Sequence, residues 1–192
     1  RLDDGSELVV KVQHAGIENI VREDLDVLTG LALLAERIPE FAPYRPAAVV
    51  AEMARTLRRE LDFGREERNL QQFAAMFRDC PTIRIPIPLT EYCTGRVLTM
   101  ERLDGIKVQD TAALLAERFD LQEVARRGAE LYLRMIFSHG FYHADPHPGN
   151  NIVREDGSIV FIDFGAVAQL SRGMREGIPQ FLAGLLRRDR DR

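Results

Sequence analysis

The sequence predicts an α+β protein, with a small β-containing lobe followed by a helical lobe. Three observations support this fold class. Segments with strand and helix patterns follow one another in the order strand, two helices, two strands, long helix, loop, hairpin and helix. The 192 residues, 45% hydrophobic and 29% charged, suffice for one sizeable core or two small lobes. A loop rich in His, Asp, Pro and Gly follows the long helix. We therefore expect residues 1–103 to form the first lobe and residues 104–192 the second, together making one domain.

The first lobe is expected to begin with a strand and two helices. Residues 7–13 read as a strand that carries Lys11 on one face. Residues 17–38 have apolar positions at helical spacing, which predicts a helix. Residues 47–77 predict a second long helix, and Gly64 is the position most apt to interrupt it.

Two strands and the second lobe complete the expected elements. Residues 83–89 read as an edge strand because Pro86 and Pro88 cannot donate to a sheet ladder. The remaining predictions are a strand at 96–100, an amphipathic helix at 121–139, a hairpin of 151–153 with 159–162, and a helix at 174–188.

Composition excludes several classes of protein. The net charge of −4 gives no nucleic-acid signature. Cys80 and Cys93 lack metal-ligand spacing, so we expect reduced thiols in a cytosolic setting. No apolar run reaches the ~18 residues of a membrane span, and no signal peptide is recognisable. Because the chain starts without Met and ends in the charged run 187–192, we expect a fragment cut at both ends.

The segment His-Ala-Asp-Pro-His-Pro-Gly-Asn at 143–150, followed by Ile-Asp-Phe-Gly at 162–165, carries the candidate chemistry. Asp145, Asn150 and Asp163 occur in the order of a kinase-type catalytic-loop Asp, a metal-binding Asn and the metal-binding Asp of a D-F-G turn. Asn150 and Asp163 offer hard oxygen ligands for Mg²⁺ against ATP phosphates, and Asp145 could orient or deprotonate an attacking hydroxyl. The simpler interpretation is that Asp145 and Asn150 are turn residues.

Two histidines of this segment have different interpretations. His143 is expected to hydrogen-bond the loop rather than to act as a base. For His147, a role in bracing the loop and a phosphate contact are equally open.

Lys11 is the candidate phosphate-binding cation. It lies in Val-Val-Lys-Val-Gln, which resembles the strand that carries the nucleotide lysine of kinases. Lys11 and Lys107 are the only lysines among 26 basic residues, and a compact ammonium has its own chemistry. We expect Glu60, on or beside the apolar stripe of the second helix, to pair with Lys11. The alternative is a solvated Lys11 and an exposed Glu60.

These motifs together resemble the UbiB family of atypical kinases, also called AarF-domain kinases. The resemblance rests on the segment 143–150, on Val-Lys-Val-Gln at 10–13, and on Glu-Leu-Asp-Phe at 60–63 with Glu67 and Asn69. It extends from about residue 5 to about residue 185 and implies a protein-kinase-like fold, with a truncated first lobe. The family's Lys-x-Gly-Gln extension and Ala-rich loop lie outside this chain, and no Ala-Pro-Glu motif follows Gly165.

The resemblance implies ATP and Mg²⁺ as cofactors. It implies phosphotransfer or ATP hydrolysis that supports ubiquinone biosynthesis or lipid homeostasis. Its partners would be a lipid or quinone precursor, proteins of a biosynthetic complex and a membrane surface. The intact protein would be cytoplasmic and peripheral to the inner membrane. By this resemblance, Lys11 is the nucleotide lysine and Glu60 is its partner. Asp145 is the catalytic aspartate, and Asn150 and Asp163 are the metal ligands. The hinge against adenine includes Met100, Glu101 and Leu103.

Two other functions remain open at this point. Small-molecule kinases of the aminoglycoside or choline type also use His-x-Asp-x-x-x-x-Asn and a later Asp. A pseudokinase would bind nucleotide and organise a lipid-biosynthesis complex without turnover.

Overall fold

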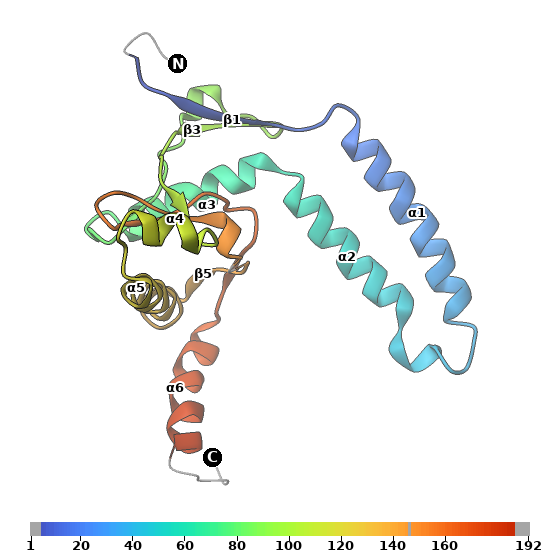
Figure 1. Ribbon diagram of the computed structural model, residues 1–192. Helices are drawn as coiled ribbons and strands as arrows, with labels where there is room; N and C mark the ends of the chain where they lie inside the picture. The colour runs from blue at the N-terminus through green and yellow to red at the C-terminus, as the bar shows by residue number, and fades with distance from the viewer. Residues whose placement is uncertain (1–4, 146, 187–192) are drawn as a thin grey trace. The chain divides into compact units, whose positions relative to one another are not determined.

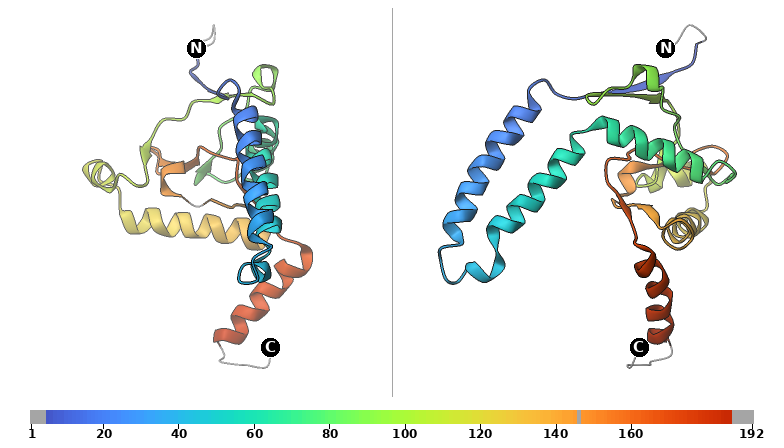
Figure 2. Two further views of the ribbon diagram at one scale, coloured as in Figure 1. Left: turned by 90° about the vertical axis from the view of Figure 1, so that its right-hand side faces the viewer. Right: turned by 180° about the vertical axis from the view of Figure 1, so that it is seen from behind.

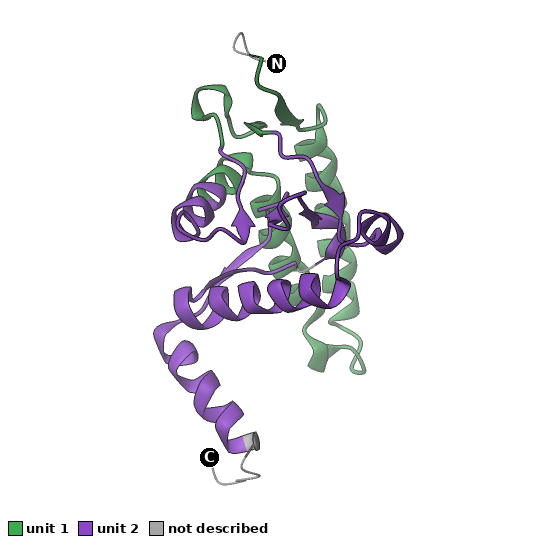
Figure 3. Cartoon of the chain, turned by 60° about the vertical axis from the view of Figure 1, so that its left-hand side comes forward, with its two compact units in different colours: residues 1–68, 88–101 green, residues 69–87, 102–192 purple. Residues whose placement is uncertain are grey.

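Figure 1 shows the computed structural model of the chain, which describes residues 5–145 and 147–186. The chain forms two compact units, coloured separately in Figure 3. Unit 1 comprises residues 1–68 and 88–101, and unit 2 comprises residues 69–87 and 102–192. Both units combine helices with short strands, so the α+β expectation is confirmed. The charged run 187–192 lies outside the described residues.

The sheet of unit 1 has two antiparallel strands, β1 (Leu8–Val12) and β3 (Val97–Glu101). Lys11 lies opposite Leu98 in the register. Leu98 and Met100 are buried, whereas Val10 and Val12 on β1 are exposed. The strands predicted at 7–13 and 96–100 are confirmed. The turn that precedes β3 includes the short 3₁₀ helix η2 (Thr90–Tyr92).

Two helices of unit 1 lie side by side, as Figures 1 and 2 show. α1 (Ile17–Ala35) is joined to α2 (Pro46–Glu60) through the 3₁₀ helix η1 (Ala42–Tyr44). Leu25 and Ala32, seven residues apart on α1, are buried. α2 begins at Pro46 because the missing N–H of proline has no partner to lose in a first helical turn. The helix predicted at 17–38 is confirmed.

The helical stretch predicted at 47–77 is divided into two helices, and its interruption lies at residues 61–62 rather than at Gly64. α2 ends at Glu60, and α3 (Phe63–Met76) begins after a break at residues 61–62. The Asp62 carboxylate accepts a hydrogen bond from Gly64 N at 3.0 Å, so Asp62 caps the new helix. The Phe63 N–H donates to Gly95 O at 3.0 Å instead of continuing α2. The chain therefore breaks at Asp62 and not at Gly64.

Unit 2 contains a four-stranded sheet in the order β2 (Ile83–Arg84), β7 (Ile159–Phe161), β6 (Asn151–Val153) and β4 (Ile106–Lys107). β2 runs parallel to β7, and the other pairs are antiparallel. β6 and β7 form the predicted hairpin. β2 lies at the sheet edge as predicted but is shorter than 83–89. The sequence did not predict β4, because a strand of two residues is too short to show alternating polar and apolar positions.

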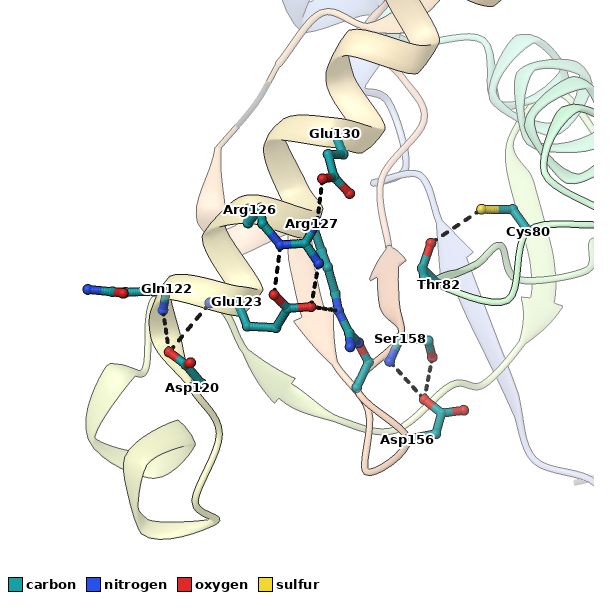
Figure 4. Close-up of polar contacts among 11 residues, drawn as sticks. Cys80, Thr82, Asp120, Gln122, Glu123, Arg126, Arg127, Glu130, Asp156 and Ser158 are labelled. Atoms are coloured by element: carbon teal, nitrogen blue, oxygen red, sulfur yellow. Dashed lines mark hydrogen bonds and ion pairs between the residues drawn. The ribbon is translucent and has the colours of Figure 1, made fainter.

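The long helix of unit 2 is α5 (Leu121–Leu133), followed by a π-helical turn, η3 (Arg134–His139), that ends at Gly140 with φ +66°. Figure 4 shows its first turn, where the Asp120 carboxylate accepts from the N–H groups of Gln122 and Glu123. Arg127 Nη1 donates to Gly157 O at 2.8 Å, which ties α5 to the hairpin turn. The helix predicted at 121–139 is confirmed.

The remaining elements of unit 2 are short, apart from the last helix. β5 (Phe141–His143) pairs antiparallel with β8 (Val167–Gln169). The helices are α4 (Thr111–Ala116), the 3₁₀ helix η4 (Pro148–Asn150) and α6 (Arg172–Leu186). The helix predicted at 174–188 corresponds to α6, and its last two predicted residues lie outside the described ones. Within residues 5–145 and 147–186, no helix is both long and apolar enough to span a membrane.

Aromatic rings form the core of unit 2. The ring centroid of Phe73, on α3, lies 4.9 Å from that of Phe141 and 5.3 Å from that of Phe164. Phe73 and Phe164 are fully buried. Because Phe141 precedes the catalytic-type loop and Phe164 belongs to the Asp-Phe-Gly turn, this core positions both segments.

His139 makes the stability of unit 2 depend on pH. Its Nε2 is buried without a hydrogen-bond partner among the described residues, and its ring lies 5.6 Å from that of Phe77. Burial, and then the charge of Arg134, lower the pKa of His139 below its ordinary value of 6.5. The unfolded chain therefore binds more protons than the native one as pH falls through 6.5, and stability is lost there.

We expect His139→Phe to flatten the pH dependence of unfolding between about pH 5 and 7, because phenylalanine keeps a ring beside Phe77 without a titratable group. Urea unfolding midpoints across this range measure the effect. A slope equal to that of the wild type would show that other groups carry the dependence.

Candidate active site

His143 connects the loop after β5 to the turn after β7. Its Nδ1 accepts a hydrogen bond from the Asp145 N–H at 3.2 Å, so its Nε2 carries the proton and donates to Asp163 O at 2.5 Å. The imidazole is 1% exposed and stacks on Phe161 with ring centroids 5.5 Å apart. His143 thus holds the backbones of Asp145 and Asp163 in register, as the loop-bracing prediction required.

Asn150 lies at the end of η4 and contacts both segments. Its Nδ2 donates to Asp145 Oδ2 at 3.1 Å, and its backbone carbonyl accepts from the Ile162 N–H at 3.0 Å. These contacts bring Asn150 beside the catalytic-type loop and beside the residue that precedes Asp163. Asp145, Asn150 and Asp163 are therefore assembled within unit 2.

The oxygens of Asn150 and Asp163 suit a hard divalent cation. Asp163 is half-buried, and its Oδ1 accepts from the Gly165 N–H at 2.9 Å, which leaves Oδ2 available. Asn150 uses its amide nitrogen toward Asp145, which leaves its Oδ1 available. One carboxylate and one amide oxygen, with water and phosphate oxygens for the other positions, is the kind of donor set that Mg²⁺ accepts.

The rest of the loop is braced locally. His147 Nδ1 accepts from the Gly149 N–H at 3.0 Å and caps η4. A β-carbon at Gly149 would lie 2.8 Å from that nitrogen, so glycine is needed for this close approach. Asn151 Nδ2 donates to His147 O at 3.1 Å. These contacts support the interpretation in which His147 braces the loop.

A buried phenol adds to the electrostatics of the site. The hydroxyl of Tyr132, on α5, has no hydrogen-bond partner among the residues that the structure describes. Burial, and then the negative charge of Asp145, raise the pKa of Tyr132 to about 12. Tyr132 therefore stays a neutral phenol at physiological pH.

In unit 1, Lys11 pairs with Glu66 rather than with Glu60. Lys11 Nζ lies 2.5 Å from Glu66 Oε1, and the two side chains are 28% and 6% exposed. Glu66 lies in the first turn of α3, whereas Glu60 is the exposed last residue of α2. The helix break at 61–62 is the reason for this correction, because it reorients the residues that follow Asp62. The partner of Lys11 is therefore Glu66, and the prediction of Glu60 for that role was wrong.

We expect Glu66→Gln to lower the free energy of unfolding by about 2 kcal/mol, because it leaves a half-buried ammonium without its carboxylate. Glu60→Gln, the matched control, should change it by less than about 0.5 kcal/mol because Glu60 is exposed. Urea unfolding of the full-length protein measures both. Equal losses in the two variants would contradict the Lys11–Glu66 assignment.

Two residues of α3, Glu66 and Asn69, contact residues of the candidate site, and sequence spacing predicted no role for either. Glu66 could have been found from Asp62, because Asp is a strong N-cap and marks a new helix start. Asn69 Nδ2 donates to Phe164 O at 2.9 Å, within unit 2, and so anchors the Asp-Phe-Gly turn. No signal in a single sequence indicates that contact.

The predicted hinge residues lie where the chain passes from unit 1 to unit 2. Met100 and Glu101 end β3, and Leu103 follows in unit 2. Met100 is 4% exposed, and it lies opposite Val9 in the pairing of β1 with β3. A role for these residues toward adenine stays a prediction.

Comparisons with known proteins agree on one family. A model of the ABC1 atypical kinase-like domain matches residues 1–192. The chain is 36% identical over 196 residues to the chloroplastic protein Activity of bc1 complex kinase 8 of Arabidopsis thaliana, covering 98% of this chain and 25% of that protein. It is 34% identical over 193 residues to a probable protein kinase UbiB of Cellvibrio japonicus, covering 98% of this chain and 35% of that protein.

A solved structure shows the same fold. The Rv3197–erythromycin complex from Mycobacterium tuberculosis matches with a TM-score of 0.68 and 25% identity, over 91% of this chain and 42% of that one. The chain spans about a quarter to a third of the length of the two curated relatives.

Proposed function

The chain belongs to the ABC1 atypical kinase-like family, and on that premise we propose that it binds ATP with Mg²⁺ and transfers or hydrolyses the γ-phosphate. The observation that carries the proposal is the assembly of Asp145, Asn150 and Asp163 around buried His143. Their order and bonding match the parts that kinase-type phosphoryl transfer needs. The family itself was correctly identified from the motifs.

Asp145 would act on the attacking group. Its Oδ2 is held by Asn150 Nδ2, which leaves Oδ1 to accept the proton of a substrate hydroxyl or to orient a water. Asp145 is exposed, so such a group can reach it. The braced backbone fixes the direction of this carboxylate before substrate binds.

Asn150 and Asp163 would hold Mg²⁺ through the two oxygens left free by their hydrogen bonds. When bound, Mg²⁺ neutralises charge on the phosphate oxygens. Lys11 would contact phosphate oxygens, with Glu66 directing its ammonium group. Met100, Glu101 and Leu103 would contact the adenine.

We propose a lipid or quinone precursor with a hydroxyl group as the acceptor. Similarity to a probable protein kinase UbiB supports a role in ubiquinone biosynthesis. The same similarity supports a protein that works with a biosynthetic complex at the surface of the inner membrane.

Calorimetric titration of the full-length protein with ATP, in Mg²⁺ and then in EDTA, tests the proposal. We expect binding in Mg²⁺ and slow phosphate release, stimulated by lipids or phenolic compounds. Binding without turnover under any such condition would favour a pseudokinase scaffold. Transfer to a soluble amino alcohol or aminoglycoside would favour a small-molecule kinase. Absence of nucleotide binding would overturn the proposal.

A further inference from the structure

We propose that unit 1 carries a separate anion site, a cavity that binds a phosphate group attached to a small molecule or a lipid. The cavity has a volume of about 750 Å³. Its walls come from α1, from the end of α2 with residues 61–62, and from the turn 94–96. All of these residues belong to unit 1.

Three arginines line this cavity: Arg22 from α1, Arg58 from α2 and Arg96 from the turn. Arg96 is already neutralised, because its Nη2 lies 2.8 Å from Glu18 Oε2 and its Nε lies 3.3 Å from Oε1. Arg22 and Arg58 have no side-chain hydrogen bond or ion pair with any described residue. Two exposed arginines without a carboxylate partner therefore line one cavity from two helices.

The two carboxylates in the wall do not compensate them. Glu18 is engaged by Arg96. Asp62 accepts from the Gly64 N–H at 3.0 Å and lies 3.6 Å from Arg68 Nη2. Guanidinium groups stay protonated at every physiological pH, so Arg22 and Arg58 bring positive charge to the lining of this cavity.

The chemistry of the lining specifies the ligand class. A guanidinium presents a planar fork of N–H donors that matches two oxygens of a phosphate. Val21, Leu25 and Leu61 line the cavity beside the arginines. A phosphate ester with an apolar substituent would satisfy both halves of the lining, with its phosphate on Arg22 and Arg58 and its carbon chain on the apolar side chains.

The cavity and the proposed nucleotide site have no residue in common. Its lining includes neither Lys11 nor Glu66, and none of the residues of unit 2. It does border the start of α3: Gly95, in its wall, accepts the Phe63 N–H, and the Leu61 carbonyl accepts from Gln13 Nε2. Amide hydrogen exchange in residues 58–66 should therefore slow when the cavity is filled.

Inorganic pyrophosphate, titrated by calorimetry into the full-length protein in EDTA without nucleotide, probes the site. We expect saturable binding that weakens by at least about tenfold in the double variant Arg22→Gln, Arg58→Gln. The double variant Arg37→Gln, Arg59→Gln is the matched control: it removes the same charge from exposed arginines outside the cavity lining. It should stay within about twofold of the wild type.

A third variant is expected to gain affinity for pyrophosphate, which misfolding could not cause. Glu18→Gln removes the carboxylate that engages Arg96, so pyrophosphate should bind a few times more tightly.

Pelleting with phosphatidylcholine vesicles, with and without phosphatidic acid, separates the two sources of the phosphate. Capture by phosphatidic acid that needs Arg22 and Arg58 identifies a lipid headgroup; pyrophosphate binding without capture identifies a soluble phosphate ester.

The inference is overturned if neither probe binds, or if the two double variants lose affinity equally. The two double variants leave Lys11 unchanged, so the difference between them reports on this cavity and not on ATP binding.

Discussion

Asp145→Asn is expected to lower the rate of phosphate release by at least about 100-fold while ATP affinity stays within about twofold. The amide cannot accept the proton of an attacking hydroxyl or water. It retains an oxygen that can accept the hydrogen bond from Asn150 Nδ2, so the loop should keep its conformation. Phosphate release at saturating MgATP and calorimetric titration measure the two quantities separately.

Asp110→Asn is the matched control for this variant. Asp110 caps α4 by accepting from the Ala113 N–H at 3.0 Å, and Asn caps helices about as well as Asp. The control should retain the wild-type rate. If Asp145→Asn turns over ATP as fast as Asp110→Asn does, Asp145 is not the catalytic aspartate.

Asp163→Asn is expected to remove the Mg²⁺ dependence of ATP binding. The Asn side chain can still accept from the Gly165 N–H, so the turn should survive, but the carboxylate charge that attracts the cation is lost. We expect affinity in Mg²⁺ to fall by about 10- to 100-fold, toward the value of the wild type in EDTA.

Titrations with and without EDTA on both proteins measure this change, and circular dichroism checks the fold. A variant that binds ATP more tightly with Mg²⁺ than with EDTA, as the wild type should, would remove Asp163 from the metal site. Asn150→Ala should then be tested as the remaining ligand.

The catalytic-type loop was predictable because its parts are close in sequence. Asp145, Asn150 and Asp163 fall within 19 residues, and a hairpin with the strong Asp-Gly turn signal lies between them. The backbone bond from Ile162 to Asn150 follows from that hairpin. Local spacing therefore places the three residues on neighbouring segments, and the Asn150 side chain contacts Asp145.

Short strands were less predictable than long amphipathic helices. The sequence indicated α1 and α5 through many apolar positions at helical spacing. β4, β5 and β8 have two or three residues each, too few to alternate visibly. Each exists because a partner strand satisfies its backbone groups, such as the pairing of Phe141 with Gln169.

The partner of Lys11 shows where local reasoning failed. Periodicity alone runs through residues 47–77 and places Glu60 on the apolar stripe. The helix ends because the Phe63 N–H finds Gly95 O, a partner more than 30 residues away, and because Asp62 caps a new helix, α3. Once α3 starts at Phe63, Glu66 occupies its first turn and meets Lys11.

The sequence by itself determined the family, the α+β class and the loop residues Asp145, Asn150 and Asp163, because motifs and local hydrogen bonds depend on neighbours along the chain. Only the tertiary structure decided that Lys11 pairs with Glu66, that His143 joins the loop to the Asp-Phe-Gly turn, and that Arg22 and Arg58 line one cavity. Those contacts join residues 20 to 55 positions apart, or bring side chains of separate helices to one cavity. They form only when packing has brought distant segments together.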